Sequence, residues 1–346
     1  MQAFVLHPAP RVGAGDALLL SDYRTLGSDM GYLSHLRLRS FRNYSSLDLA
    51  FGPHFNVLVG ANGQGKSNLI EAVCYLALLR SFRSRRVSPL KEWGADAFFV
   101  GGKLSGVDET DGHIDLSVGY DEKRVLRLNQ QTIEKASDFI NSFICVTLVP
   151  EDIDLVAGPA GGRRRFLDIF LCQMDPYYMV NLQRYVEALR CRNVMLRRPA
   201  KYPAAAFASY ERLLIEHGAF VVCRRIQWVE RLNAALSSLS PELFPAADLT
   251  VSVVFSPSLP KCGEKADSQA DMMECFSETL ERCRDRDQNE GATRYGPHRD
   301  GFSFHLNGRD LALFGSEGER RAACLALRLA CLALVRGTCG DGRPVV

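Results

Sequence analysis

The segment Gly60-Ala61-Asn62-Gly63-Gln64-Gly65-Lys66-Ser67 has the residue types and the spacing of a loop that binds phosphate groups. Glycine has no Cβ, so successive backbone N–H groups around Gly63 to Ser67 can point inward at a bound anion. In such a loop the Lys66 ammonium reaches the β- and γ-phosphates of a nucleotide, and the Ser67 hydroxyl ligates Mg²⁺. The spacing therefore predicts a nucleotide site with a magnesium ion beside it.

The residues on either side of this loop predict the strand and the helix that must position it. The preceding run Phe55-Asn56-Val57-Leu58-Val59 is short and mostly apolar, which is typical of a buried strand. After the loop, apolar residues recur at helical spacing, at Leu69, Ile70, Val73, Leu76 and Ala77. Further upstream, residues 33–51 predict two strands joined by a turn at Arg42-Asn43-Tyr44.

The rest of the chain divides by composition. It has 346 residues, 47% of them apolar and 24% charged, which indicates a globular protein with two lobes. Residues 1–30 predict a poorly ordered extension, and residues 31–150 predict an α/β lobe. Residues 151–285 predict a mainly helical lobe, in which Asp175 caps a helix that begins at Pro176. The pattern of residues 286–346 predicts further strands and then a buried helix, so we expect these residues to rejoin the first lobe.

Charge and cysteine content exclude several classes of protein. The net charge of +2 is too small to indicate nucleic-acid binding by itself. Arginine outnumbers lysine by 34 to 8, which suits forked contacts with phosphate but is explained equally well by codon usage. The 11 cysteines form no Cys-x-x-Cys pair, so we expect reduced thiols and a cytoplasmic protein. No apolar run approaches the roughly 18 residues of a membrane span.

Several blocks of sequence carry a family resemblance, beginning with Asn62 to Ala72 around the phosphate loop. This block resembles the P-loop of the RecF family and, more distantly, those of SMC-type and ABC-type ATPase heads. Further blocks match the same family in the same order along residues 31–346. They are Leu38 to Tyr44, Val149 to Asp152, Gly162 to Asp168, Tyr295 to Asp300, Asn307 to Asp310 and Phe314 to Arg321.

The resemblance implies an α/β fold, in which a P-loop ABC-ATPase-like head lobe carries an inserted, mainly helical lobe. It also implies that ATP and Mg²⁺ lie between two subunits, so that ATP binding drives formation of a homodimer. The signature motif that faces the partner's ATP would be Ser316-x-Gly318-Glu319-Arg320, with Ser316 and Gly318 in contact with the nucleotide. Ser316 and Glu319 also have the spacing of a helix capping box, and the two roles are compatible. Arg42 and Asn43 are weaker candidates for positions near the nucleotide.

The resemblance further implies binding to single-stranded, double-stranded or gapped DNA, in recombinational repair and replication-fork maintenance. Other recombination-mediator proteins of the same pathway would be partners. Each basic cluster of the sequence is open to a second interpretation, as a solvated face without a ligand. The candidate contacts with DNA are Arg83, Arg85, Arg86, Arg163, Arg164, Arg165, Arg197 and Arg198.

Other functions fit the sequence less well. A GTPase needs an Asn-Lys-x-Asp motif, which does not occur in this sequence. A small-molecule kinase needs an acceptor pocket that the sequence does not indicate. An SMC-like, chromosome-organising ATPase head remains as the alternative function, but prolines interrupt residues 151–285 and sustained heptads are absent. His298-Arg299-Asp300 fits a structural turn better than a catalytic group, because no nucleophile is identified nearby.

The acidic Walker B pair of the family is not found up to Val346. Val345 and Val346 resemble the first residues of the strand that would carry this pair, so we expect the sequence to stop before it. Glu151 and Asp152 are disfavoured as a substitute, because Pro150 intervenes and the family places this block at the junction of the lobes. ATP hydrolysis by the chain as given is therefore doubtful.

Overall fold

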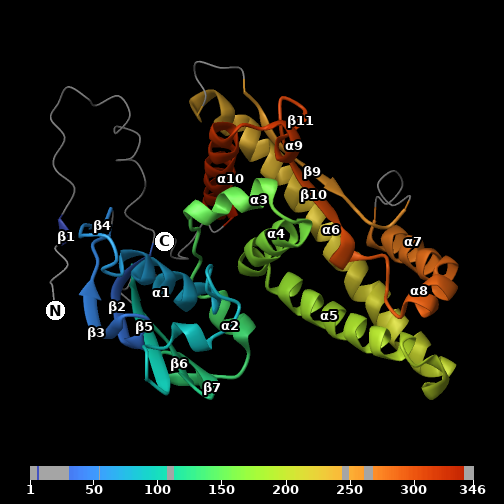
Figure 1. The fold of residues 1–346 in the computed structure, drawn as a ribbon, viewed down its shortest axis with the longest axis horizontal. Coiled ribbons are helices and arrows are strands. Elements are labelled where there is room, and N and C mark those ends of the chain that lie inside the picture. Colours follow the sequence, from blue (N-terminus) through green and yellow to red (C-terminus); the bar gives the residue numbers. More distant parts are fainter. Residues whose placement is uncertain are drawn as a thin grey trace. The chain divides into compact units, whose positions relative to one another are not determined.

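The computed structural model describes residues 6–7, 31–53, 55–106, 113–243, 249–260 and 268–338. The chain divides into two compact units (Figure 1). Unit 1 comprises residues 1–147 and 337–346, and unit 2 comprises Leu148–Arg336. Most of the predicted extension at residues 1–30, and the apolar end at Val345 and Val346, lie outside the described residues.

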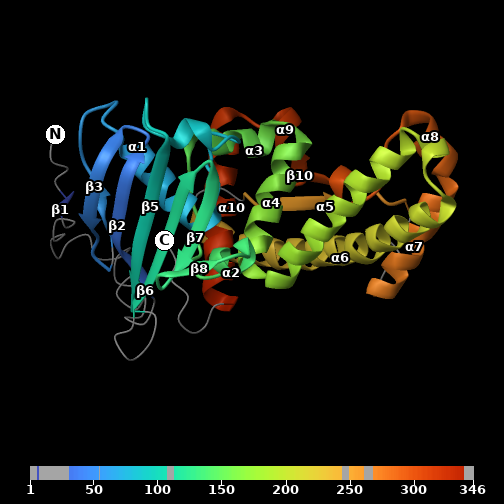
Figure 2. The same cartoon turned by 90° about the horizontal axis from the view of Figure 1, so that it is seen from below.

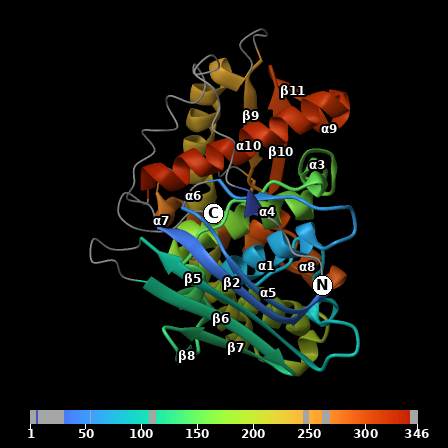
Figure 3. The same cartoon turned by 90° about the vertical axis from the view of Figure 1, so that its left-hand side faces the viewer.

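Unit 1 is built on a six-stranded antiparallel sheet of order β3-β2-β5-β6-β7-β8. Figures 2 and 3 show these strands side by side. The predicted pair of strands at residues 33–51 is confirmed, because β2 and β3 meet at a tight turn where Phe41 pairs with Tyr44. The strands are β2 (Tyr32–Phe41), β3 (Tyr44–Ala50), β5 (Ala97–Ser105), β6 (His113–Asp121), β7 (Lys123–Leu128) and β8 (Gln131–Ile133).

The helix predicted after the phosphate loop is α1, Lys66–Leu78, which packs against β2, β5 and β6. Three buried rings join the helix to the sheet: Phe41 and Phe98 lie 5.6 Å apart, and Tyr75 lies 5.6 Å from Phe98. These edge-to-face contacts bury large apolar surfaces at the base of the loop. The short elements of unit 1 are η2 (Ser88–Leu90) and α2 (Ala136–Ile140).

The strand before the phosphate loop is shorter and more exposed than its sequence predicts. It is β4, Val57–Leu58, and among the described strands it pairs only with β1, Leu6–His7. The side chains of Phe55, Val57 and Val59 are 69%, 45% and 55% exposed, so the predicted burial of this run is wrong for the described residues. The physical reason is that a strand paired along one edge, with no described layer against its faces, leaves its apolar side chains in solvent.

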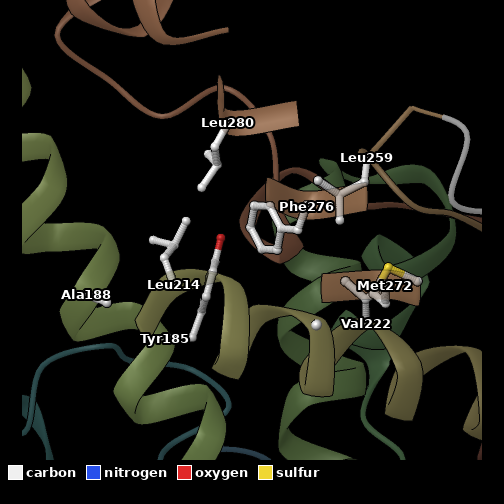
Figure 4. Close-up of a cluster of buried hydrophobic side chains, with 9 residues drawn as sticks. Tyr185, Ala188, Leu214, Val222, Leu259, Met272, Phe276 and Leu280 are labelled. Atoms are coloured by element: carbon white, nitrogen blue, oxygen red, sulfur yellow. The ribbon is translucent and has the colours of Figure 1, made fainter. Parts of the chain in front are cut away.

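Unit 2 contains the predicted helices. Asp175 caps α5 as expected, because its carboxylate accepts hydrogen bonds from the Tyr177 and Tyr178 backbone N–H groups. Figure 4 shows the core where α5, α6 and α7 meet, with Tyr185 and Phe276 among the buried side chains. The helices before residue 290 are η3 (Pro150–Asp152), α3 (Ile153–Ala157), α4 (Ala160–Met174), α5 (Pro176–Leu196), η4 (Pro199–Lys201), α6 (Ala204–Leu243), α7 (Gln269–Arg282) and α8 (Arg284–Glu290).

Residues 286–336 also pack in unit 2, although the sequence predicts that they rejoin the P-loop lobe. The reason lies in strand pairing. Strand β9, which precedes the predicted boundary at residue 285, pairs along its whole length with β10, which follows it. The elements concerned are β9 (Val251–Ser256), η5 (Pro297–Arg299), β10 (Gly301–Leu306), β11 (Arg309–Asp310), α9 (Leu311–Phe314) and α10 (Glu317–Thr338).

The cysteines depart in part from the expectation of reduced thiols. Cys275 is disulfide-bonded, whereas eight others are thiols outside any disulfide bond: Cys74, Cys145, Cys172, Cys191, Cys223, Cys283, Cys324 and Cys331. Within the described parts of the chain, no helix is both long and apolar enough to cross a membrane.

Candidate functional site

Backbone geometry explains the glycines of the phosphate loop. Gly63 and Gly65 have φ angles of +82° and +103°, a region that residues with a Cβ rarely adopt. A Cβ on Gly65 would also lie 2.6 Å from Asn43 Nδ2 and 2.9 Å from the Tyr44 hydroxyl oxygen. Any other residue at position 65 would therefore push the loop away from the β2–β3 turn.

The same turn holds the loop by hydrogen bonds. Asn43 Nδ2 donates to the Gln64 carbonyl at 3.1 Å, and the Tyr44 hydroxyl donates to the Gly65 carbonyl at 3.1 Å. Asn68, on the first turn of α1, donates through Nδ2 to Asn43 Oδ1 at 2.8 Å. Asn43, predicted as a candidate near the nucleotide, thus contacts the loop itself and fixes its shape.

The N-terminus of α1 has no side-chain cap. Its N-cap residue is Gly65, which makes no side-chain cap, and the first turn holds no acidic residue. Lys66 Nζ donates to the carbonyls of Gly60 at 2.6 Å and Ala61 at 2.7 Å, so the ammonium lies across the loop. The Ser67 side chain is exposed on the same turn. These groups fit a nucleotide phosphate and Mg²⁺, because a positive helix end, an ammonium and a hydroxyl converge at one loop.

The guanidinium of Arg42, a predicted candidate near the nucleotide, is bound to a buried carboxylate. Its Nε and Nη2 donate to Glu71 Oε2 at 2.9 Å and Oε1 at 2.6 Å, and Glu71 is 0% exposed. Its Nη1 donates to the Pro89 carbonyl at 2.7 Å. Arg42 therefore ties α1 to the segment that follows it. No feature of the sequence pattern pointed to Glu71 as its partner.

The predicted signature motif begins helix α10 with the expected capping box. The Ser316 N–H donates to Glu319 Oε2 at 2.7 Å, and the Glu319 N–H donates to Ser316 Oγ at 3.3 Å. The hydrogen bonds from Ser316 lower the pKa of Glu319. Ser316 and Gly318 are exposed, and a Cβ on Gly318 would meet nothing within 4 Å. The start of α10 is thus open to a ligand.

Two arginines hold α10 in place, Arg320 in its first turn and Arg328 near its middle. Arg320 donates through Nε to the Leu311 carbonyl at 2.9 Å and through Nη2 to the Ala312 carbonyl at 3.1 Å. Arg328 forms a forked ion pair with Asp152, at 2.7 Å and 3.1 Å. Asp152 Oδ2 also accepts the Val149 N–H at 3.1 Å. The Asp152 carboxylate therefore links α10 to the residues before α3.

The basic clusters separate into two groups. Arg163 donates to the carbonyls of Val156 at 3.3 Å and Gly158 at 2.6 Å. Arg164 donates to the Asp300 carbonyl at 2.7 Å, and burial lowers the pKa of its guanidinium. These two are built into the fold, and Arg165 is half-buried. The exposed arginines are Arg83, Arg85, Arg86, Arg197 and Arg198.

The segment around His298 is structural, as expected from the sequence. His298 Nε2 lies 2.9 Å from the Thr293 carbonyl and must donate to it, so Nδ1 accepts the Tyr185 hydroxyl hydrogen at 2.6 Å. Burial lowers the pKa of His298 to about 4. Within the described ranges, no group of three His, Cys, Asp or Glu side chains is placed to hold a metal ion.

Known proteins resemble the chain over most of its length. Residues 32–339 match the family described as RecF/RecN/SMC N terminal domain. The DNA replication and repair protein RecF of an Exiguobacterium species is 32% identical over 317 residues, covering 90% of this chain and 82% of that protein. The protein of the same name from Leptospira interrogans is 32% identical over 300 residues, covering 86% of this chain and 79% of that protein.

Solved structures agree with the sequence relatives. The structure described as the recombination mediator protein RecF-ATP in RecFOR pathway has a TM-score of 0.85 at 25% identity, covering 93% of this chain and 85% of that chain. The structure described as RecF-ATPrS has a TM-score of 0.82 at the same identity. The α/β ATPase-head fold with a helical insertion is therefore correct. A phosphate loop at an uncapped helix end, a capping-box signature helix and these matches lead to one conclusion: the chain belongs to the RecF family.

Proposed function

We propose that this protein is an ATP-dependent DNA-binding protein of recombinational repair and replication-fork maintenance. The observation that carries the proposal is the phosphate loop at the uncapped N-terminus of α1, in a chain whose residues 32–339 match the family. The relatives are named DNA replication and repair proteins, and the similar solved structure is described as holding ATP.

ATP and Mg²⁺ would bind at the residues Gly60 to Ser67. The Lys66 ammonium, which now donates to the Gly60 and Ala61 carbonyls, would turn to the β- and γ-phosphates. The Ser67 hydroxyl would ligate Mg²⁺, whose charge offsets that of the phosphates. Asn43 and Tyr44 hold the loop in the shape that this binding requires.

The signature helix would complete the site from a second copy of the chain. Ser316 and Gly318 stand exposed at the start of α10, and a helix N-terminus attracts the negative γ-phosphate. ATP binding would therefore favour a homodimer. The arginines that remain exposed, at positions 83, 85, 86, 197 and 198, would then bind the phosphates of single-stranded, double-stranded or gapped DNA.

Other recombination-mediator proteins are the proposed protein partners, because the similar solved structures are described as members of the RecFOR pathway. An ATP-driven dimer on DNA would present such partners with a surface that the free monomer lacks. Co-sedimentation with a mediator protein should therefore increase when both ATP and DNA are present.

Calorimetric titration of ATP into the full chain tests the nucleotide site. We expect Lys66→Ala to weaken ATP binding by about 1 kcal/mol or more, because it removes a charge-assisted contact. Lys201→Ala is the matched control, since Lys201 is an exposed lysine in unit 2. Equal ATP affinity of Lys66→Ala and the parent would contradict the assignment.

Filter binding at increasing salt tests the DNA interface. The affinity for duplex DNA should fall steeply with salt, show little preference for sequence and rise when ATP is added. An affinity that does not change with salt, or no binding at low salt with ATP present, would count against DNA binding.

A further inference from the structure

Trp93 is a large apolar side chain that the fold leaves in solvent. In the chain it lies between α1 and β5, and it is 101% exposed. Trp228, the other tryptophan, is 6% exposed and packs edge-to-face on Phe170. The Trp93 indole stacks on no aromatic ring of the described residues. An indole with both faces free offers a stacking surface for another planar group.

Four arginines precede this tryptophan in the sequence. The segment 80–94 exposes Arg80, Arg83, Arg85 and Arg86, and none of these four pairs with a carboxylate of the described chain. The first acidic residue of the segment is Glu92, whose carboxylate accepts a hydrogen bond from the Ser45 hydroxyl. The segment is therefore a stretch of uncompensated positive charge that ends in an exposed aromatic ring.

Glu71 of helix α1 fixes the first half of this segment. The Ser81 hydroxyl donates to Glu71 Oε1 at 2.5 Å. The same hydroxyl oxygen accepts the Arg83 and Ser84 backbone N–H groups, both at 2.9 Å. The arginines thus project from a backbone that is held by a carboxylate of the P-loop helix.

Arg42, the partner of Glu71, fixes the second half. The Arg42 guanidinium donates to the Pro89 carbonyl, and its backbone N–H donates to the Leu90 carbonyl at 2.8 Å. The Glu92 N–H donates to the Ser40 carbonyl at 2.8 Å, and a turn with Gly94 at φ +84° follows Trp93. Both halves of the segment are therefore attached to one buried ion pair.

We propose that the segment 80–94 binds a DNA strand that contains unpaired bases, with arginines on the phosphates and one base stacked on Trp93. The inference rests on the proposed DNA binding and adds the kind of DNA that this surface selects. A base in a duplex already stacks between its neighbours, so only an unpaired base is free to cover the indole. Because the backbone is already fixed, stacking costs little conformational entropy. The excess of arginine favours a polyanion over a protein as the ligand.

The decisive comparison keeps the phosphates and removes the bases. Binding of the full chain with ATP is measured to a short oligothymidylate, to an abasic strand of the same length and to a duplex. We expect the parent to bind oligothymidylate at least about fivefold more tightly than the abasic strand, as one base–aromatic stack contributes. Trp93→Ala should lose this difference and keep the affinity for duplex, whereas Trp93→Phe should retain part of it.

Two further measurements separate stacking from charge. Oligothymidylate should quench the tryptophan fluorescence of the parent and leave that of Trp93→Phe nearly unchanged, because Trp228 is buried. Combined Arg83→Ala, Arg85→Ala and Arg86→Ala substitutions should weaken binding to the oligothymidylate and the abasic strand equally and reduce the dependence on salt.

The outcomes distinguish this inference from the proposed function. An unchanged ratio of oligothymidylate to abasic affinity in Trp93→Ala, with duplex binding intact, overturns the stacking role and leaves DNA binding standing. Failure of the parent to bind any of the three DNAs at low salt overturns the proposed function and this inference together.

Discussion

The arginines of the unit 2 core and those of the segment 80–94 have the same chemistry and opposite surroundings. Arg225 and Arg192 are 1% and 0% exposed. Arg225 donates to Asp168 at 2.8 Å and Asp300 at 2.7 Å, and Arg192 donates to Asp287 at 2.7 Å. The arginines at 83, 85 and 86 are exposed, and no carboxylate of the described residues forms an ion pair with them. An arginine that has a buried carboxylate as its partner stabilises the fold, whereas an exposed arginine without one can bind a ligand.

Burial of the carboxylates in the unit 2 core costs free energy, because it removes their charge from water. Burial raises the pKa of Asp300 in spite of the adjacent Arg225 charge. Asp300 also accepts the Ser258 N–H at 2.9 Å, so the ion pair is embedded in further hydrogen bonds. Such a pair resists removal of one member, because the other charge would stay buried without a partner. An exposed arginine leaves no such charge behind when it is replaced.

Arg225→Met tests the difference between buried and exposed arginines most directly. We expect it to lower the free energy of unfolding more than any other variant proposed below. Loss of this guanidinium leaves the Asp300 carboxylate buried without its cation and should lower the free energy of unfolding by about 3–5 kcal/mol. Urea denaturation measures the change. Arg198→Ala, at an exposed arginine, is the control and should change stability by less than about 0.5 kcal/mol. A similar loss in both variants would abolish the distinction between the two classes.

A second prediction concerns pH and the neighbouring His298. Its pKa is lowered from 6.5 to about 4, chiefly by burial. Between these two values the unfolded chain binds a proton that the folded chain does not, so stability falls as pH decreases through this window. Full protonation corresponds to roughly 3 kcal/mol. The free energy of unfolding is measured by urea denaturation at several pH values. Between pH 4 and 6.5 it should depend less steeply on pH for His298→Gln than for the parent.

The control for this pH effect is His113→Gln, because the side chain of His113 is 50% exposed. We expect this variant to keep the slope of the parent. An identical slope for His298→Gln and the parent would mean that the histidine is protonated as easily in the folded state as in the unfolded chain.

The third prediction concerns the buried ion pair of unit 1, in which Glu71 is the buried carboxylate. Glu71→Gln weakens the forked bond from Arg42 and should cost about 2 kcal/mol, as for a hydrogen bond between charged groups. Hydrogen exchange should also quicken at the Arg83 and Ser84 amides, which depend on Ser81. Glu242→Gln, at an exposed glutamate, should change neither property. Unchanged exchange in Glu71→Gln would show that the segment holds its shape without the ion pair.

The smallest effect is expected at the signature helix. Ser316→Ala removes an N-cap and should cost about 1 kcal/mol, whereas Ser316→Asp keeps a good N-cap and should preserve stability. An aspartate would nevertheless repel the γ-phosphate of a partner's ATP. We expect Ser316→Asp to melt like the parent and to lose ATP-dependent dimerisation in analytical ultracentrifugation. An intact dimer in this variant would limit Ser316 to its capping role.

Local features of the fold could be predicted from the sequence because their partners lie within a few residues. Asp175 caps the two N–H groups that follow it, and Ser316 exchanges hydrogen bonds with Glu319. The β2–β3 turn is fixed by the pairing of Phe41 with Tyr44. By contrast, the exposure of Phe55 and Val59 did not follow from their apolar character, because burial depends on which layer covers a strand.

The phosphate loop, the helix that follows it and the capped signature helix could all be predicted from the sequence, since each depends on spacing along one element. Which arginines remain available for a ligand depends instead on the folded structure. Arg42 finds Glu71, Arg164 finds the Asp300 carbonyl and Arg328 finds Asp152. These partners are separated by 29, 136 and 176 positions. A charge in a sequence has no fixed role until folding brings, or fails to bring, an opposite charge or an acceptor to it.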